Sequence, residues 1–347
     1  MIIVPYLIAI FALAILMVVH EGGHYLAARL FGMPVTRFSI GFGPRLYAYK
    51  PEGSHTIFQI ALIPFLAYVQ IAGMNPYEPH DPEDKGSYLN ASLMGRMITV
   101  AAGPAANYLF ASVLLFFGFL VGGRLTLDET SMRVSVAHHG PAYAADMRDG
   151  DKILEVDQEP VAHWDALQQA IRKHPGEPID ILIERGGEKR VLQVTPRPKG
   201  MPDEGKILIG PEQRMIPVGV GEALKISLIE PPRVVYGLVE GLVHIVTGKE
   251  KAELSGPVGI VREAAHAVRV GVGDTFKLLG IISAYLGGFN LLPIPALDGG
   301  RLLFLIFEAV ARRKTNSKVE AHVHALGLVM MLALVVLVTW VEIMPKR

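Results

Sequence analysis

The chain has 347 residues, of which 51% are hydrophobic and 19% charged, and its formal net charge at pH 7 is +0. This composition excludes an ordinary soluble domain and indicates a protein embedded in a lipid bilayer. The balanced charge and the lack of a long basic run argue against a nucleic acid partner, and the absence of Cys excludes disulfides and thiolate metal sites.

The first apolar stretch, residues 2–31, contains the pentapeptide His20-Glu21-Gly22-Gly23-His24. On a helix, His20 and His24 lie one turn apart on the same face, so both imidazoles can bind one zinc ion. Glu21 is then free to act as general base toward a water molecule. A chance match is the alternative, but three ionisable side chains in an apolar segment are costly in lipid, which favours a functional site.

This first stretch predicts a retained transmembrane helix, because it has neither a positively charged start nor a small-residue cleavage site. Arg29, Arg37, Arg45 and Lys50 follow the helix closely. Positive charges near the end of a span favour the cytoplasmic side. We therefore expect the N-terminus outside and the zinc site toward the cytoplasm.

Short runs of β-branched and aromatic residues replace the helical period in residues 35–74. Residues 37–40, 46–49, 56–60 and 67–71 predict strands, separated by Gly41-Phe42-Gly43-Pro44 and by Pro51-Glu52-Gly53. We expect a small membrane-associated β-hairpin sheet beside the metal helix. A polar, Pro-containing loop follows in residues 75–88.

The second long apolar stretch, residues 96–121, predicts another transmembrane helix. Near its start lies Gly103-Pro104-Ala105-Ala106-Asn107. The small residues favour close packing between helices. Asn107 is a candidate for supporting the zinc site through a hydrogen bond to one of the metal ligands.

Residues 124–198 are charged and rich in turns, which predicts a folded α+β domain in water. Strands are expected at residues 134–137 and 152–156, a helix at 164–173, and a hairpin of residues 179–184 and 190–195 around Gly186-Gly187. This domain follows the second span and is therefore expected outside. Residues 199–273 are expected to be a linker, residues 199–221, followed by an amphipathic helical segment, residues 232–246, and a turn at residues 255–260.

The last part of the chain, residues 274–347, predicts a third transmembrane helix at residues 274–292 and a fourth at 325–341. Between them lies the run Asn290-Leu-Leu-Pro293-Ile-Pro295-Ala-Leu-Asp298-Gly299-Gly300. The two Gly allow backbones to approach closely, so Asp298 is the candidate for the third zinc ligand.

Several basic residues also lie between these two helices and are expected in the cytoplasm: Arg312, Arg313, Lys314 and Lys318. His322 and His324 follow them. Because positions two apart do not share a helix face, we interpret both His as solvated interface residues, not as ligands.

The H-E-x-x-H pentapeptide and the N-x-x-P-x-P-x-L-D-G-G run of residues 290–300 together resemble the motifs of the bacterial site-2 proteases. The resemblance extends over essentially the whole chain. Gly41-Phe42-Gly43 matches a turn in the family's re-entrant β-loop, residues 103–107 match a further family motif, and residues 140–154 resemble circularly permuted PDZ domains. The chain departs from the family at Phe65-Leu66-Ala67-Tyr68, where a Gly-Gly-Tyr run is common.

The resemblance implies an α-helical polytopic membrane protein with about four transmembrane helices, a membrane-associated β-hairpin sheet and one α+β PDZ domain. It implies a zinc metalloendopeptidase of the bacterial inner membrane, acting on single-pass membrane proteins such as pre-trimmed anti-sigma factors, or on remnant signal peptides. In that family pattern His20, His24 and Asp298 bind Zn²⁺, Glu21 is catalytic, and Asn290 orients the substrate.

Two other classes of function are weighed against this one. A non-catalytic membrane scaffold presenting a PDZ domain has no need of Glu21, which is intact here. A transporter with a metal-bound core would be expected to show a repeated half, which the sequence lacks. Within the PDZ domain, peptide binding by strand addition and a purely steric role both stay open.

Overall fold

The computed structural model describes residues 3–77, 84, 86–200, 203–249 and 256–344. The chain divides into two compact units: a helical unit, made of Met1–Gly122 and Val218–Arg347, and an inserted unit, Gly123–Pro217. The predicted boundary after residue 123 lies within one residue of the observed one. The inserted unit continues to Pro217, beyond the predicted domain end at residue 198, and so includes residues that we expected to form a linker.

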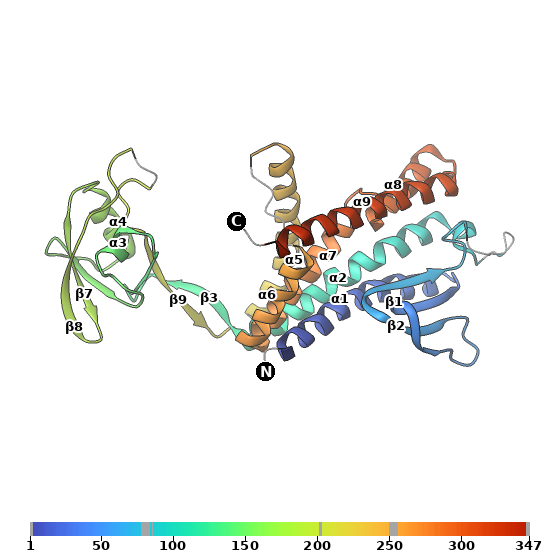
Figure 1. The fold of residues 1–347 in the computed structure, drawn as a ribbon, viewed down its shortest axis with the longest axis horizontal. Helices are drawn as coiled ribbons and strands as arrows, with labels where there is room; N and C mark the ends of the chain where they lie inside the picture. Colours follow the sequence, from blue (N-terminus) through green and yellow to red (C-terminus); the bar gives the residue numbers. More distant parts are fainter. Residues whose placement is uncertain (1–2, 78–83, 85, 201–202, 250–255, 345–347) are drawn as a thin grey trace. The chain divides into compact units, whose positions relative to one another are not determined.

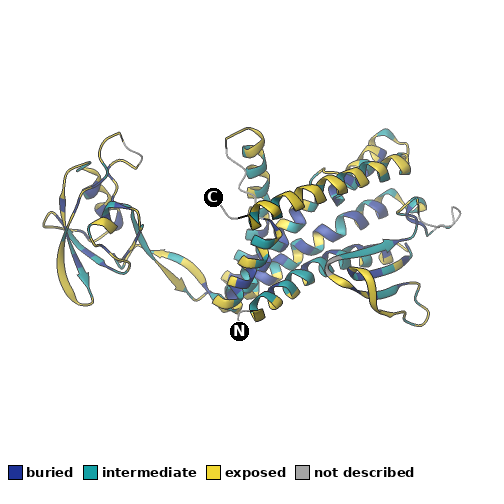
Figure 2. Ribbon diagram, in the orientation of Figure 1, coloured by how far each residue is buried: buried dark blue, intermediate teal, exposed yellow. Residues whose placement is uncertain are grey.

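The helical unit is organised around α2 (Leu93–Gly122), which contacts α1 (Ile3–Leu30) on one side and α7 (Val272–Asn290) on another (Figure 1). Leu16, Leu114 and Leu279, one from each of these helices, form a common buried cluster. The described residues of this unit form four further α-helices: α5 (Val220–Val246), α6 (Pro257–Val270), α8 (Asp298–Ala311) and α9 (Ser317–Ile343). Buried residues follow α1, α2 and α7, whereas α9 is largely exposed (Figure 2).

Among the described residues, three helices are long and apolar enough to cross a membrane, namely α1, α2 and α9. The third predicted span corresponds to α7, which does not meet these criteria. Charged Asp274 and Lys277 lie in its first turns, and small residues such as Gly280 face α2. These residue types lower the hydropathy of a helix that is packed against protein over much of its length.

Two local predictions in the helical unit differ from the structure in detail. The amphipathic helix does not begin near residue 232, because α5 runs continuously from Val220 and contains Pro231 and Pro232. Its buried residues Ala223, Ser227 and Pro231 recur every four positions, so one face of the helix packs along its whole first half. The expected turn near residue 257 is the start of α6, whose first turn is capped by the carboxylate of Glu342 through the amides of Gly256 and Gly259 at 2.6 and 3.2 Å.

The predicted small sheet is present beside α1. It consists of β1 (Val35–Tyr49) and β2 (Ile57–Ile71), two long antiparallel strands that bend back so that β1 pairs with both halves of β2. The resulting order of segments is 67–71, 35–40, 57–60 and 45–49, which confirms the four predicted strands. Gly41, with φ +94°, lies at the bend of β1. Within the described sheet, residues 67–71 form an edge, whereas residues 57–60 are paired on both sides.

The inserted unit is an α+β unit with two sheets. A four-stranded antiparallel sheet has the order β6 (Glu159–Pro160), β5 (Lys152–Val156), β7 (Ile179–Arg185), β8 (Glu188–Val194). A second sheet pairs β9 (Ile209–Ile216) with β3 (Arg124–Asp128) and β4 (Val134–Val136), and two helices, α3 (Pro141–Ala144) and α4 (Trp164–Arg172), complete the unit. The predicted strands, helix and hairpin of residues 134–195 are confirmed. The linker prediction is wrong for β9, and the PDZ identity of the unit stays a prediction.

A buried ion pair stabilises the inserted unit. The carboxylate of Asp151, with the residue 1% exposed, accepts bonds from Nε and Nη2 of Arg185 at 2.7 and 2.8 Å and from the Arg148 amide at 2.8 Å. Burial alone would raise the pKa of Asp151, but the hydrogen bonds from Arg185 and Arg148 outweigh it and hold the pKa below its ordinary value. The pair joins the loop before β5 to the end of β7.

Candidate metal centre

Three predicted ligands from distant parts of the chain converge in the helical unit. His20 and His24 are buried on one face of α1, and Asp298 is the first residue of α8. The Nε2 atoms of the two His are 3.3 Å apart, and Oδ2 of Asp298 lies 3.1 Å from His20 Nε2 and 3.3 Å from His24 Nε2. These residues form the group of three potential metal ligands found among the described residues.

A hydrogen bond from Nδ1 of His24 determines that Nε2 is the ring nitrogen that faces this centre. Nδ1 of His24 donates to the backbone carbonyl of Thr99 in α2 at 2.8 Å, so the lone pair is on Nε2. Hydrogen bonds of this kind orient a metal ligand and raise its basicity. His24 therefore presents an unprotonated nitrogen to Asp298 and His20.

Asn107 of α2 lies against the other His, with its side-chain amide 3.2 Å from Nδ1 of His20, and its Oδ1 has no partner among the described residues. Amide oxygen and nitrogen positions follow from the hydrogen-bond network. If the two are exchanged, Oδ1 accepts the Nδ1 proton of His20, which gives Oδ1 a partner and leaves the lone pair of His20 on Nε2. Asn107 thus acts on His20 as the Thr99 carbonyl acts on His24.

The arrangement of donor atoms fits zinc. Ligands at the usual zinc distances of about 2.0–2.2 Å in a tetrahedral site lie about 3.3–3.5 Å from one another. The three observed separations of 3.1–3.3 Å are close to this value. Oδ2 of Asp298 is buried and receives no hydrogen bond from the described residues, as expected for an oxygen that binds a cation. Two imidazoles and one carboxylate also form the ligand set of many catalytic zinc sites.

Local packing explains how Asp298 reaches α1. The turn before α8 brings its first residues against the end of α7, where a Cβ on Gly299 would lie 2.2 Å from the carbonyl oxygen of Leu292. Only a residue without a side chain fits there, which agrees with the predicted role of the Gly pair in close backbone approach.

The small residues of the 103–107 run pack directly on the metal ligands. A Cβ on Gly103 would lie 2.2 Å from Nε2 of His24. Both interpretations of this run therefore apply: its small residues allow α2 to approach α1, and Asn107 contacts a candidate ligand.

Glu21 lies beside the three candidate ligands and close enough to interact electrostatically with each of them. Its carboxylate accepts a hydrogen bond from the backbone amide of Val69 in the edge segment of β2. Asn290, the last residue of α7, is half-buried and donates to the carbonyl of Leu286 at 2.9 Å. This hydrogen bond does not connect Asn290 with the three candidate ligands.

Sequence reasoning missed two features near this centre. His324 is 8% exposed, so its interpretation as a solvated residue is wrong; Nδ1 of His324 accepts from the backbone amide of Ala296 at 3.0 Å. Ala296 has φ +79°, a conformation that is costly for a residue with a side chain. The second feature is the buried ion pair between Arg96 and Glu308, and the signal for it was a charged residue within each of two apolar helices.

Comparison with known proteins adds to this geometry. The chain matches the family model of Peptidase family M50 over residues 8–334. The zinc metalloprotease RasP of Geobacillus kaustophilus is 30% identical over 402 residues, covering 93% of this chain and 94% of that protein. The regulator of sigma-W protease RasP of Bacillus subtilis is 26% identical over 404 residues, with 93% and 94% covered.

Proposed function

Because the chain belongs to peptidase family M50 and is a zinc metalloprotease, we propose that it hydrolyses peptide bonds within or beside the transmembrane segments of other membrane proteins. The observation that carries this proposal is the convergence of Asp298 of α8 with His20 and His24, which lie with Glu21 on α1, a helix apolar enough to span a bilayer. The proposed substrates are single-pass membrane proteins, such as pre-trimmed anti-sigma factors, and remnant signal peptides.

The chain's own residues supply most of the chemistry. A zinc ion bound by the three ligands would act as a Lewis acid toward the attacking water and the scissile carbonyl. Glu21 takes the proton from the water and delivers it to the leaving amine as the peptide bond breaks. The Val69 amide orients the carboxylate of Glu21, and Thr99 and Asn107 hold the two imidazoles.

Substrate presentation follows from the sheet. A transmembrane helix shields its peptide bonds through its own hydrogen bonds, so a substrate must unwind before it can be cut. Residues 67–71 form a sheet edge that includes Val69, whose amide contacts Glu21. We infer that the unwound segment adds to this edge as a strand. Residues 57–60, in contrast, are already paired on both sides. Asn290 is proposed to hydrogen-bond the substrate backbone after release from Leu286.

The proposed location is the bacterial inner membrane, with the N-terminus and inserted unit outside and the zinc site toward the cytoplasm. The chain has no Cys, so single Cys residues can be introduced at Ser54 and at Lys189 and labelled with an impermeant reagent. Labelling of position 189 but not of position 54 in intact spheroplasts is expected. The reverse pattern would refute the orientation.

The decisive test of the function is Glu21→Gln. This change removes the base while keeping the side chain's size and all three ligands, so zinc content should stay at one per chain while cleavage of a model transmembrane substrate falls by about 10²–10⁴-fold. Glu52→Gln, at an exposed position of the same unit, is the matched control and should cleave normally. Normal proteolysis by the zinc-loaded Glu21→Gln protein would refute the proposed function.

A further inference from the structure

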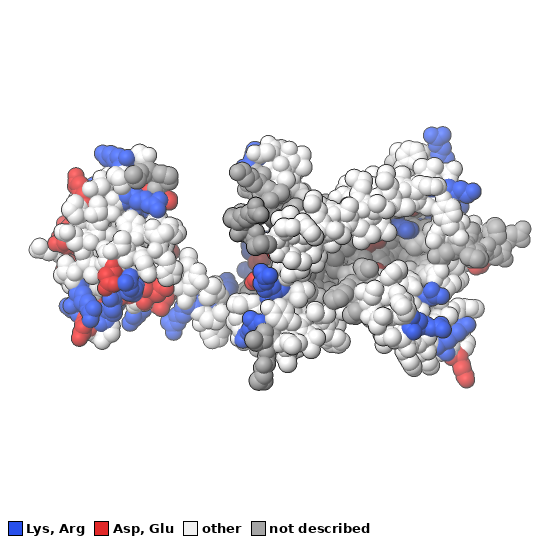
Figure 3. Space-filling model, viewed as in Figure 1, with Lys and Arg blue, Asp and Glu red and all other residues white. Residues whose placement is uncertain are grey.

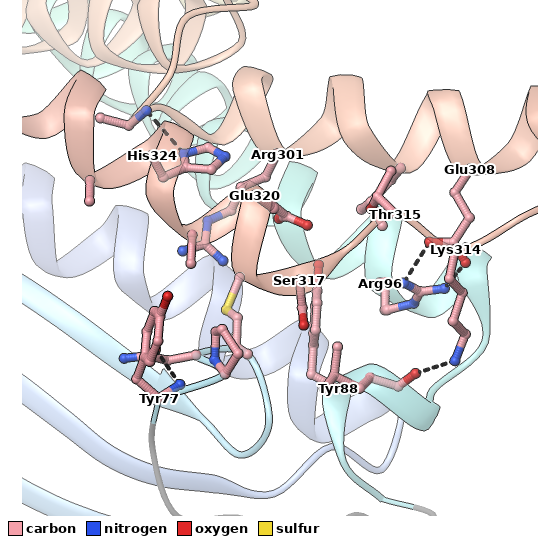
Figure 4. A pocket seen from close by; sticks show the side chains of 18 of the residues that line it. Tyr77, Tyr88, Arg96, Arg301, Glu308, Lys314, Thr315, Ser317, Glu320 and His324 are labelled. Atoms are coloured by element: carbon pink, nitrogen blue, oxygen red, sulfur yellow. Dashed lines mark hydrogen bonds and ion pairs between the residues drawn. The ribbon is translucent and has the colours of Figure 1, made fainter.

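The helical unit contains a cavity of about 430 Å³ whose lining includes several charged side chains (Figure 4). It lies between the segment after β2, the short helix η1 (Tyr88–Asn90), the start of α2, and the helices α8 and α9. Its described lining includes Ala296 but none of His20, Glu21, His24 and Asp298. The cavity is therefore distinct from the metal centre, although it lies beside the turn that carries Asp298.

Three residues that line this cavity each have a buried polar atom without a hydrogen-bond partner among the described residues. These atoms are the hydroxyl of Tyr88, Nε of Arg96 and Nε2 of His324. The three residues are 5%, 5% and 8% exposed, respectively. Buried polar groups in native proteins are almost always hydrogen-bonded, so three such atoms in the residues lining one cavity indicate a bound group that supplies the missing partners.

All three atoms are hydrogen-bond donors. Nδ1 of His324 accepts from the Ala296 amide, so the proton of the ring is on Nε2. The Nε of Arg96 is a donor in every state, and its terminal nitrogens are already paired with Glu308. Burial raises the pKa of Tyr88 to about 12, so its hydroxyl keeps a proton to donate. The missing partner is thus a group with several acceptor oxygens.

The charges around the cavity favour an anion. Arg96 and Glu308 neutralise each other, and Arg301 of the lining balances Glu320, with which it interacts electrostatically. Lys314 then leaves one positive charge in the lining. Exposed Arg312, Arg313 and Lys318 extend the positive charge beyond the cavity.

The position of the cavity in the helical unit favours a lipid. Its walls include the first turns of α2 and α9, two helices that can span the bilayer, so it lies where spans meet water and where lipid phosphates are found. The sides of the helices are largely uncharged in Figure 3, whereas Lys and Arg gather toward their ends. Leu328 of α9 lines the cavity, and the exposed Leu326 and Val329 beside it provide an apolar surface for acyl chains.

We propose that this cavity binds an anionic phospholipid, whose phosphate and ester oxygens together accept hydrogen bonds from Tyr88, Arg96 and His324. Basic pockets between transmembrane helices are suited to anionic headgroups. The acyl chains then lie on the exposed face of α9. Inorganic phosphate offers acceptor oxygens of the same kind, and the experiment below distinguishes it from the lipid.

Occupancy is coupled to the metal centre through His324. An acceptor at Nε2 stabilises the tautomer with its proton on that nitrogen, and this tautomer leaves Nδ1 free to accept from Ala296. Ala296 has a strained backbone and precedes Asp298 by two residues. The bound lipid therefore helps to hold the turn that places Asp298 against His20 and His24.

The test uses the purified full-length protein in a neutral detergent and a fluorescent short-chain phosphatidylglycerol. Tyr88→Phe removes only the hydroxyl. His324→Asn removes the Nε2 donor but keeps an acceptor near the position of Nδ1. Each variant should bind the lipid about tenfold or more weakly, as expected for losing one hydrogen bond to a charged group. Lys318→Gln, a charge outside the cavity lining, is the matched control and should bind within about twofold of the unmodified chain. Zinc content, measured in parallel, should be kept in His324→Asn and lost in part in His324→Leu.

Several results would overturn the proposal. Equal binding by all variants, or binding that depends on Lys318 alone, would show non-specific attraction to the basic surface. Equally tight binding of a diacylglycerol with the same acyl chains would show that the phosphate does not contribute to binding. Inorganic phosphate binding as tightly as the lipid would assign the cavity to free phosphate. Tighter binding of a capped acidic peptide would assign it to a substrate carboxylate.

Discussion

Replacing Gly103 by Ala in α2 should damage the metal centre without replacing any of the candidate ligands. The added Cβ would lie 2.2 Å from Nε2 of His24 and 2.5 Å from its Cε1. Non-bonded heavy atoms are comfortable at about 3.5 Å, so ring and methyl must separate by about 1 Å. The hydrogen bond from His24 to the Thr99 carbonyl, one turn away on the same α2 helix, resists rotation of the ring. The separation must therefore come from α1 moving away from α2 or from the ring leaving the centre.

Either movement exceeds what a zinc site tolerates, because metal–ligand distances are held to within about 0.2 Å. Overpacking itself should cost about 1–3 kcal/mol of folding stability. Loss of ligand alignment should weaken zinc binding by at least the 10–100-fold that is typical for damage to groups supporting a ligand. The control is Gly22→Ala, within the His20–His24 pentapeptide, where an added Cβ meets no described atom within 4 Å. That substitution should keep zinc and stabilise α1 slightly, since Ala favours helix over Gly by about 1 kcal/mol.

The assay is zinc content by mass spectrometry after dialysis against a graded series of chelator concentrations, with thermal unfolding in detergent as a check on folding. The Gly103→Ala protein should be folded, lose zinc at lower chelator concentration and cleave poorly, and added zinc should restore part of the activity. Zinc retention and cleavage equal to those of Gly22→Ala would refute the packing of α2 on His24.

Three further predictions follow from the geometry. Asp298→Ala should lose zinc, whereas Asn290→Ala should keep it and cleave poorly; stoichiometric zinc in Asp298→Ala would exclude α8 from the ligand set. Asn107→Ala should keep the fold but lower zinc affinity about 10–100-fold, measured by chelator competition, because it removes the partner of a ligand; unchanged affinity would show that Asn107 only fills space. The pKa of Asp151 is lowered in the folded state, so the ion pair with Arg185 stabilises the inserted unit above pH about 4 and this contribution is lost as the pH falls through the folded pKa. Asp151→Asn should therefore weaken the hydrogen-exchange protection of β5 at pH 7. The protection of β5 in this variant should no longer fall when the pH is lowered. If protection in the variant still fell with pH as in the unmodified chain, the contribution assigned to this ion pair would be refuted.

The candidate ligands were accessible from the sequence because their chemistry restricts the residue type. Two imidazoles one helical turn apart leave a signature within five positions. Asp298 was found from a different signal, an acidic residue followed by Gly-Gly at the end of an apolar segment. Their mutual distances of 3.1–3.3 Å agree with these assignments, while the roles in binding and catalysis remain predictions for the experiments above.

The fold could be predicted from the sequence where a single hydrophobic period dominates a segment. It could not be predicted where packing against neighbouring segments determines the structure. The long apolar helices α1, α2 and α9 and the alternating strands of the small sheet were found from their own residues. In contrast, α7 has the small residues of a helix packed against another, and α5 continues through two Pro that normally end a helix. Strand β9 contains Gly210 and Pro211, which predict a linker, but it is held in place by pairing with β3 and β4.

The groups that orient the ligands were least visible in the sequence, for a physical reason. His24 is held by the carbonyl of Thr99, an atom that every residue possesses, so no side chain at that position identifies the interaction. Gly103 leaves room for the imidazole of His24 because it has no side chain. The sequence around Gly103 resembles that of any closely packed helix. His324 was judged by its basic neighbours along α9, whereas its burial depends on the turn at Ala296, brought to it by the folding of α8 and α9. A ligand must be of a particular residue type, but the groups around it need only be in the right place, and that position is determined by packing between helices.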